Sequence, residues 1–532
     1  MLRDLRSALA RRGEGLPELA KAPIRIALTI AGAVSLGAYE GGALAALLVA
    51  VQAGLRKPAP PIQVDVIGGA SAGAITGLMA ARALVAGIDP VTMMLAAWVE
   101  RDDLSMMTSH QPHEPLSMDV LARTAVDVLD RNAAYGQPRQ RAPVHIRMAL
   151  GCLRGLNYEI QGLAPPEAKP VQASTYIDWS TFALPPGPGF GDDYTKEGGL
   201  IESALASGAT AFGFGPRWLN RSIFDKEYRA ANVTNLPASK AMWYTDGGTI
   251  NNEPIGRTLD LVNEVQRERR FPKRARRLLL LIHPHPEAPL GDDHWAKPKS
   301  NPPDWIKTGA RAAGMAATHG IYEDLRRAAK TNSRIEWTTE LARLIEQNVP
   351  PGGAVEFGDA LATFIGNTDQ TKARLSARKT RPATNRASAL TLAERILLAI
   401  QLASGLEAKR KVDIEVVSPL ILSSTPVEQV LAGAFLMSFG GFLDKDLRLS
   451  DFDLGYRSML KWLETCLPIY ASTEDSHAAL DAATARYDPS WNKDKGGATF
   501  ASLAWADKLK ALRLGLHVGR VVAGEAISPR QP

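Results

Sequence analysis

The chain has 532 residues, more than the roughly 250–300 at which a single hydrophobic core usually stops growing, so more than one structural unit is expected. Hydrophobic residues make up 45% and charged residues 22% of the sequence, which argues against a disordered, fibrous or coiled-coil chain. A net charge of +6 is too small over this length to indicate a nucleic-acid partner, and two cysteines, Cys152 and Cys466, cannot organise a disulfide framework or a cysteine-rich zinc site.

The sequence predicts neither secretion nor a transmembrane segment. Residues 1–22 mix arginines with acidic residues and lack a continuous apolar run, so we expect a short basic helix there and not a signal peptide. The longest uncharged stretch, residues 66–81, is shorter than the roughly 20 apolar residues that a spanning helix needs. We therefore expect a cytoplasmic protein, whose small positive charge is compatible with peripheral contact with an anionic membrane surface.

Two strand–turn–helix units follow the N-terminal segment. Each begins with a short apolar run, continues through a turn of small residues and ends in a helix-compatible stretch. The predicted strands are 24–30 and 64–68, the turns 31–37 and 69–73, and the helices 38–51 and 74–85. Two successive units of this kind predict a buried parallel sheet covered by helices, and thus an α/β fold.

The remaining elements alternate less regularly. A mainly helical stretch is predicted at 91–129, and the Gly/Pro-rich segments 163–170 and 184–199 are predicted surface loops. The further predicted strands are 144–150 with 156–160 as a pair, then 174–182, 278–283 and 412–419. Helical spacing is predicted across 304–411, at 427–439 and at 501–514, with a basic interruption at 372–386 and a polar loop at 475–497.

These elements predict five segments. They are a basic N-terminal helix (1–22), a catalytic core (23–290), a mainly helical insertion (291–411), a strand with helices that rejoin the core (412–470) and a C-terminal extension (471–532). The basic run at 267–277 has two interpretations, the solvated end of a helix or a contact with anionic lipid head groups.

A nucleophile candidate lies in the second turn. Gly69-Ala70-Ser71-Ala72-Gly73 is a G-x-S-x-G sequence between a predicted strand and a predicted helix, which is the context of a nucleophile elbow. The glycines let the backbone turn sharply and leave room beside the Ser71 oxygen. The helix that follows directs its N-terminal amides, that of Ala72 among them, toward the place where negative charge would develop on a substrate carbonyl.

A serine hydroxyl is a weak nucleophile until a base takes its proton. Asp246 is the better candidate, because Gly247 and Gly248 directly after it allow the chain to turn and bring the carboxylate close to another backbone. Two distal histidines, His283 and His517, are the alternative bases of a conventional serine esterase.

Together these parts resemble the patatin-like phospholipase family. The resemblance is carried by the glycine-containing loop after the first strand, by residues 69–77 around the elbow and by the later Asp246-Gly247-Gly248. Residues 207–216 resemble the segment before that aspartate. Two C-terminal stretches, 439–444 and 451–456, look like part of a larger bacterial patatin-related subgroup.

The resemblance implies a three-layer α/β/α sandwich with a mainly parallel central sheet, extended here by the helical insertion and a C-terminal helical extension. It also implies a lipid acyl hydrolase, a phospholipase A, lysophospholipase or related carboxylic ester hydrolase, that works through an acyl-enzyme intermediate. Ser71 would be the nucleophile and Asp246 the base, with no metal and no cofactor. A poorly hydrated pocket would raise the pKa of Asp246 and suit it to that role.

The loop at Gly32–Gly37 departs from the family pattern of three glycines, any residue, a basic residue and a glycine. Gly32 and Gly37 are kept, whereas Ala33, Val34 and Leu36 replace two glycines and the basic residue. The backbone N–H groups of Ala33 and Val34 remain predicted oxyanion donors, because main-chain donors do not depend on the side chain. The missing cation indicates a substrate less dependent on phosphate than a phospholipid.

Two other hypotheses stay open at the level of sequence. One is a serine esterase that uses a distal histidine, and the other is a non-enzymatic lipid-binding or interaction protein on a patatin-like fold. The sequence does not define the head group, the acyl position, the chain length or the oligomeric state.

Overall fold

The computed structural model describes residues 23–286, apart from 102, 110–113, 161–170, 190, 211–212 and 269–275, then 324–339, scattered residues between 341 and 409, and 411–527. The predicted N-terminal helix, the basic run at 372–386 and most of the insertion lie outside the described residues. The chain divides into two compact units, of which the smaller comprises residues 262–271 and 323–413. In the smaller unit residues 324–339 are helical, and Asn332 Nδ2 donates to the carbonyl of Val412 at 2.7 Å.

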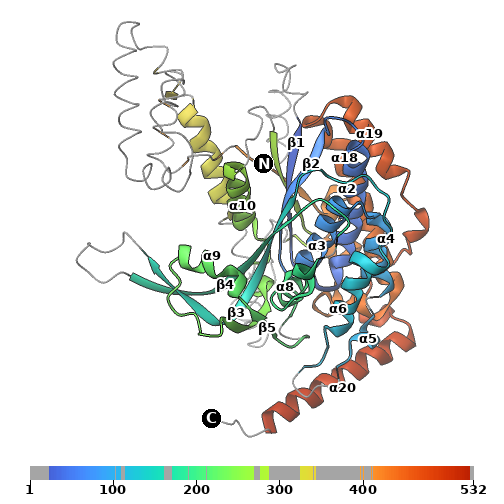
Figure 1. Ribbon diagram of the computed structural model, residues 1–532. Helices are drawn as coiled ribbons and strands as arrows, with labels where there is room; N and C mark the ends of the chain where they lie inside the picture. Colours follow the sequence, from blue (N-terminus) through green and yellow to red (C-terminus); the bar gives the residue numbers. More distant parts are fainter. Residues whose placement is uncertain are drawn as a thin grey trace, which may run out of the picture. The chain divides into compact units, whose positions relative to one another are not determined.

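An eight-stranded mixed sheet forms the centre of the larger unit (Figure 1). Its strands are β1 (Ile24–Ile30), β2 (Ile62–Gly69), β3 (Val144–Ile160), β4 (Val171–Leu184), β5 (Arg217–Asn220), β6 (Ala241–Asp246), β7 (Arg276–Ile282) and β8 (Asp413–Val417). The order is β5-β6-β3-β2-β1-β7-β8, and β4 pairs with β3 off this path. The β1–β2, β1–β7 and β2–β3 pairs are parallel, whereas β4 and β6 run antiparallel to β3 and β5 runs antiparallel to β6.

Helices surround this sheet (Figure 1). They are α2 (Gly37–Gly54), α3 (Ala72–Ala86), α4 (Pro90–Leu95), α5 (Leu104–Met107), α6 (Asp119–Val126), α7 (Asp192–Thr195), α8 (Leu200–Ser207), α9 (Asp225–Ala230), α10 (Ile255–Glu268), α16 (Val427–Val430), α17 (Phe435–Ser438), α18 (Lys445–Thr465), α19 (Thr473–Thr484) and α20 (Trp505–Ile527). The α/β fold class predicted from the sequence is confirmed.

Neighbouring residues of β2 show that both faces of the sheet are covered. A side chain added at Gly77 of α3 would touch Ile67, while one added at Gly68 would collide with Thr258 in the first half of α10. Successive residues of a strand point to opposite faces, so α3 and α10 lie on opposite sides of the sheet. This arrangement gives the predicted three layers.

Strand β3 brings two other strand ends together. β2 runs parallel to its first part, with Gly69 opposite Met148, and β6 runs antiparallel to its next part, with Asp246 opposite Leu150. β4 pairs with β3 over both stretches and therefore occupies the other edge. β2 and β6 thus share one edge of β3 and meet end to end, so the residues that follow Gly69 lie close to Asp246.

The prediction of a strand pair at 144–150 and 156–160 is wrong, because β3 is one long strand. Its register with β4 is irregular between Gly151 and Leu156, and Gly155 has a φ of +77°. Glycines in a bulge resemble a turn in the sequence, although the strand continues through them.

Helix α2 lies inside the fold. The segment Val34–Gly54 is long and apolar enough to cross a membrane by length and composition, with a mean hydropathy of 1.7, and 89% of it is buried within the protein. Glu40 interrupts this segment, so it does not form one long uncharged stretch in the sequence. That side chain is fully buried and hydrogen-bonded with Thr76 at 3.2 Å, and burial raises its pKa well above the usual value.

Two predictions in the C-terminal part are wrong. The helix expected at 427–439 is two separate turns, because Leu431 after α16 is extended, with φ and ψ of −76° and 137°. Within α17 itself, Leu436 and Met437 have φ angles of 53° and 54°, which a regular α-helix cannot include. The polar loop expected at 475–497 contains α19, whose first turn is capped by the side chain of Ser472. The last predicted helix is confirmed as part of α20.

A buried ion pair joins β2 to β7 across β1. The β1–β2 register passes from Ile26–Val64 to Ala27–Val66 and skips Asp65. The Asp65 carboxylate accepts two hydrogen bonds from Arg277, at 2.5 and 3.0 Å, and both side chains are buried. The ion pair and the register shift at Asp65 therefore fix β2, β1 and β7 relative to one another.

Asp65→Asn is expected to lower the free energy of unfolding by about 3–5 kcal/mol, because the buried guanidinium of Arg277 loses the carboxylate that accepts both of its hydrogen bonds. Thermal and urea unfolding would measure the loss. Asp225→Asn, which breaks surface pairs with Arg229 and Lys240, is the control and should lower the free energy of unfolding far less. Equal stability of the Asp65 and Asp225 variants would contradict this view of the sheet.

Candidate active site

Ser71 lies in a sharp turn between β2 and α3. Its φ and ψ angles are 54° and −129°, a backbone conformation that residues other than glycine rarely adopt. A side chain at Gly69 would come within 2.4 Å of the Gly73 carbonyl, and one at Gly73 within 2.4 Å of the Ile30 carbonyl. Both glycines of the G-x-S-x-G sequence are therefore required by the backbone packing that holds Ser71.

The side chains of Ser71 and Asp246 are hydrogen-bonded. Ser71 Oγ donates to Asp246 Oδ2 at 2.8 Å, and Thr210 Oγ1 donates to the same oxygen at 2.6 Å. The Gly248 N–H donates to Asp246 Oδ1 at 2.6 Å. The exposed fractions of Ser71 and Asp246 are 4% and 5%, so the pair is shielded from water.

Burial sets the acid–base character of this pair. It raises the pKa of Asp246 above the ordinary value of 3.8, and the hydrogen bonds from Thr210, Ser71 and Gly248 oppose that rise. A carboxylate with a raised pKa is a stronger base than an exposed aspartate. The arrangement can therefore draw a proton from the hydroxyl group that it touches.

The Asp246-Gly247-Gly248 turn packs closely against β3. A side chain at Gly247 would come within 2.2 Å of the Ala149 carbonyl, and one at Gly248 within 2.8 Å of Asn252 Oδ1. The two glycines thus let the carboxylate approach Ser71 and leave room for the Gly248 N–H to donate to it.

The loop after β1 passes beside Ser71. A side chain at Gly32 would touch Ser71 Cβ at 3.0 Å, and the Gly32 N–H donates to the carbonyl of Asn252 at 3.0 Å. Gly37 lies against the ring of Trp98, where no side chain would fit. Leu36, which replaces a basic residue of the family pattern, is buried in the core and brings no charge to the loop.

Val34 adopts the conformation that a glycine would adopt easily. Its φ angle is 53°, which is an outlier for a β-branched residue. The next residue, Ser35, is tied to the C-terminal part of the chain, because its Oγ donates to the carbonyl of Ser438 at 2.5 Å and accepts from the Gly441 N–H at 3.1 Å. These contacts hold the loop in a shape that the local sequence does not favour.

Backbone donors remain next to Ser71. Among the described residues, none accepts a hydrogen bond from the N–H groups of Ala33, Val34 or Ala72. Val34 and Ala72 also line the pocket into which Ser71 opens. These N–H groups are therefore available to a ligand at this end of the pocket.

Three polar residues of the site were not singled out from the sequence. Ser207 Oγ accepts from the Ser71 N–H at 2.9 Å, Thr210 contacts Asp246, and Asn252 Nδ2 donates to the Gly32 carbonyl at 3.2 Å. Ser207 and Thr210 lie in the stretch 207–216 and Asn252 lies six residues after Asp246, but only the fold shows which side chains point to the site.

The alternative histidine bases lie elsewhere in the described structure. His283 Nε2 is 3.0 Å from Glu253 Oε1, and the Ser71 hydroxyl has Asp246, not a histidine, as its partner. His517 belongs to α20, and none of the described contacts of Ser71 or Asp246 involves it. The described residues also hold no group of three or more His, Cys, Asp or Glu side chains that would bind a metal ion.

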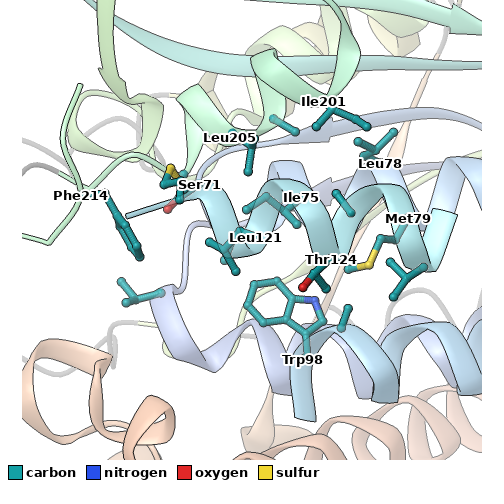
Figure 2. Close-up of a pocket in the computed structure, with 18 of the residues that line it drawn as sticks. Ser71, Ile75, Leu78, Met79, Trp98, Leu121, Thr124, Ile201, Leu205 and Phe214 are labelled. Atoms are coloured by element: carbon teal, nitrogen blue, oxygen red, sulfur yellow. The ribbon is translucent and has the colours of Figure 1, made fainter. Parts of the chain in front are cut away.

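An apolar pocket extends from Ser71 along α3 (Figure 2). Its walls surround about 770 Å³ of space when the open solvent at its mouth is counted, whereas its cavity volume is about 60 Å³. Apart from Ser71, its only hydroxyl groups are those of Thr124 and Thr210. Apolar side chains make up most of the wall, namely Val34, Ile75, Leu78, Met79, Trp98, Met118, Leu121, Val128, Leu129, Ile201, Leu205, Phe214 and Phe442.

Comparison with known proteins gives one clear match. The model of the family described as patatin-like phospholipase matches residues 28–259, a range that includes Ser71 and Asp246. Among solved structures, that of VipD from Legionella pneumophila is similar at 12% sequence identity over 96% of this chain and 93% of that chain, with a TM-score of 0.22. No curated protein matches this chain.

Asp246→Asn is expected to stabilise the protein at neutral pH. Because the pKa is raised in the folded state, ionisation of Asp246 opposes folding, and this cost grows as the pH rises from 3.8 through the raised pKa. Asparagine does not ionise, and it can donate to Ser71 and Thr210 while accepting from Gly248. The melting temperature of the variant should exceed that of the wild type at about pH 8, and the two should converge toward about pH 4.

The control is Asp225→Asn, since the pKa of Asp225 is lowered by its Lys240 and Arg229 partners. Its effect should have the opposite sign, a loss of stability at neutral pH. A destabilised Asp246→Asn protein at about pH 8 would contradict the assignment of a raised pKa to Asp246.

Proposed function

Residues 28–259 are a patatin-like phospholipase domain, and from this premise we propose that the protein is a lipid acyl hydrolase in which Ser71 is the nucleophile and Asp246 the general base. The observation that carries the proposal is the 2.8 Å hydrogen bond from Ser71 Oγ to a buried carboxylate, at the end of an apolar pocket. The family as a whole supports hydrolase activity on lipids, whereas the dyad and the ester class are part of the proposal.

In the first half of the reaction, Ser71 Oγ attacks the ester carbonyl carbon while its proton passes to Asp246 Oδ2. The carbonyl oxygen becomes an oxyanion, which the N–H groups of Ala72 and of Ala33 or Val34 stabilise. The acyl carbon–oxygen bond to the alcohol then breaks. Asp246 returns the proton to the departing alkoxide, which leaves an acyl ester on Ser71.

In the second half, a water molecule attacks the acyl-enzyme carbonyl and gives one proton to Asp246. The bond between the acyl carbon and Ser71 Oγ breaks, and the proton moves from Asp246 to Ser71 Oγ, so a free fatty acid leaves and both residues recover their starting states. Thr210 and Gly248 hold the carboxylate in place through both halves, because each donates to one of its two oxygens.

The apolar wall defines the acyl side of the substrate. Ser71, which precedes α3, and residues 75, 78 and 79 on one face of α3 line the pocket, and the eight steps from Ser71 to Met79 rise about 12 Å along the helix. A fully extended hydrocarbon chain advances roughly 1.25 Å per carbon–carbon bond, so this length accommodates a chain of about ten carbons. The loop without a cation at residue 36 supports an ester whose recognition does not depend on a phosphate held there.

Ser71→Ala and Asp246→Ala are each expected to reduce ester hydrolysis by about 1000-fold or more, because each removes one half of the proton-transfer pair. Release of p-nitrophenol from acyl esters and of fatty acid from lipids would measure the loss. Ser203→Ala is the control, since its buried hydroxyl donates to the Gly198 carbonyl and does not touch Asp246. Full activity in either dyad variant would refute the mechanism, and absence of fluorophosphonate labelling of the wild type would favour a non-enzymatic lipid-binding protein.

Met79→Trp is expected to shift the preference toward shorter acyl chains, because the larger side chain fills the end of the pocket farthest from Ser71. The ratio of kcat/KM for decanoyl over butanoyl esters should fall about tenfold or more. Met106→Trp, at a half-exposed position of α5 outside the pocket, is the matched control and should keep the wild-type ratio. An unchanged ratio in the Met79 variant would show that the acyl chain lies elsewhere.

A further inference from the structure

Helix α20 has an inner face that packs against the larger unit. Ala511 and Leu514 lie against the main hydrophobic core, and Asp507 forms an ion pair with Lys510 at 3.2 Å. Lys510 Nζ also donates to the Leu443 carbonyl at 3.1 Å and lies 3.6 Å from Asp103, just before α5. In Figure 1, α20 is the long red helix at the lower edge, beside α5.

The opposite face of α20 exposes large apolar side chains. Trp505, Leu512 and Leu516 are 72%, 53% and 67% exposed. Their spacing of seven and four residues places them on one side of a helix with 3.6 residues per turn, and Ala511 and Leu514 fall on the other side. The stripe therefore faces outward because the inner face is already occupied.

Cationic side chains flank this stripe. The half-buried Lys508, whose Nζ donates to the Ala501 carbonyl at 2.7 Å, lies on one side of it, and the exposed Arg513 and Arg520 lie on the other. Asp507, the acidic residue among the described side chains of α20, is turned inward and mostly buried. The outer surface of the helix thus combines apolar area with positive charge and no described carboxylate.

This surface is close to the candidate active site. Lys510 binds the carbonyl of Leu443, which ends the 3₁₀ turn Gly440–Leu443, and Phe442 of the same turn lines the pocket of Ser71. A helix with its side chains is about 10–12 Å across. The outer stripe therefore lies roughly one helix diameter beyond the contact that joins α20 to the pocket wall.

We propose that α20 is an interfacial helix that docks the larger unit on an anionic lipid surface. Trp505, Leu512 and Leu516 enter the boundary between head groups and acyl chains, while Lys508, Arg513 and Arg520 contact the anionic head groups. A second copy of the chain suits this surface less well, because the stripe spans about two heptads, fewer than the three or four of a typical coiled coil, and the flanking cations would repel one another. The proposal rests on the proposed function for its purpose, but binding itself requires neither Ser71 nor Asp246.

The test is co-sedimentation of the full chain with phosphatidylcholine vesicles that contain or lack phosphatidylserine. Wild type and Ser71→Ala should bind the phosphatidylserine vesicles equally, and added salt should weaken this binding. Leu512→Asp combined with Leu516→Asp should reduce the binding at least about tenfold, because two exposed leucines that would enter the lipid are replaced by charges that the anionic surface repels. Ile223→Asp, an exposed apolar residue outside α20, is the matched control and should bind like the wild type.

Hydrolysis of a short soluble ester separates this proposal from the catalytic one. The double leucine variant should keep its melting temperature and its activity on that ester, since neither residue lines the pocket. Equal vesicle binding by wild type and the double variant would overturn the proposal, as would no binding by the wild type. A wild-type dimer that the double variant converts to monomers would assign the stripe to a second copy. Vesicle binding without ester hydrolysis would refute the dyad alone.

Discussion

The hydrogen bond between Ser71 and Asp246 depends on the edge of one strand, β3. Two strands that arrive from opposite directions, β2 and β6, share that edge and end within two residues of each other, at Met148 and Leu150. The parallel strand β2 alone would bring only Ser71 and α3 to this edge. The antiparallel strand β6 alone would bring only Asp246. The mixed character of the sheet is therefore what joins a serine at the start of a helix to a carboxylate at the end of a strand.

Several costs of folding are concentrated around this bond. Asp246 is ionisable and buried, Ser71 has a positive φ, and Val34 adopts a left-handed conformation that opposes its branched side chain. Each is held by contacts from another part of the chain, namely Thr210 on the carboxylate, Ser207 on the Ser71 N–H and the Ser35 contacts beside Val34. Burial of the Asp246 carboxylate destabilises its charged form, which lowers the stability of the folded protein. The same burial raises the pKa of Asp246 and makes it a stronger base for proton transfer.

The sequence was informative where the signal is local. Ser71 and Asp246 each stand at a strand end with glycines that the turn requires, and strands such as Ile24–Ile30 have continuous apolar runs, so both could be predicted. The partners Ser207, Thr210 and Asn252 could not be assigned, because their roles follow from strand pairing and not from spacing. Apolar periodicity also predicted one helix at 427–439, since periodicity carries no information about the positive φ angles of Leu436 and Met437.

The departure of the Gly32–Gly37 loop from the family pattern has a structural counterpart far away in the chain. Where the pattern expects a glycine, Val34 takes a positive φ, and the neighbouring Ser35 is bound by Ser438, which lies 403 residues later and itself has a positive φ. The 3₁₀ turn Gly440–Leu443 then connects three surfaces: Gly441 donates to Ser35, Phe442 forms part of the pocket wall, and the Leu443 carbonyl binds Lys510 of α20. The C-terminal part of the chain therefore completes the site that the N-terminal βα units begin, because one turn contacts the loop beside Ser71, the pocket and α20.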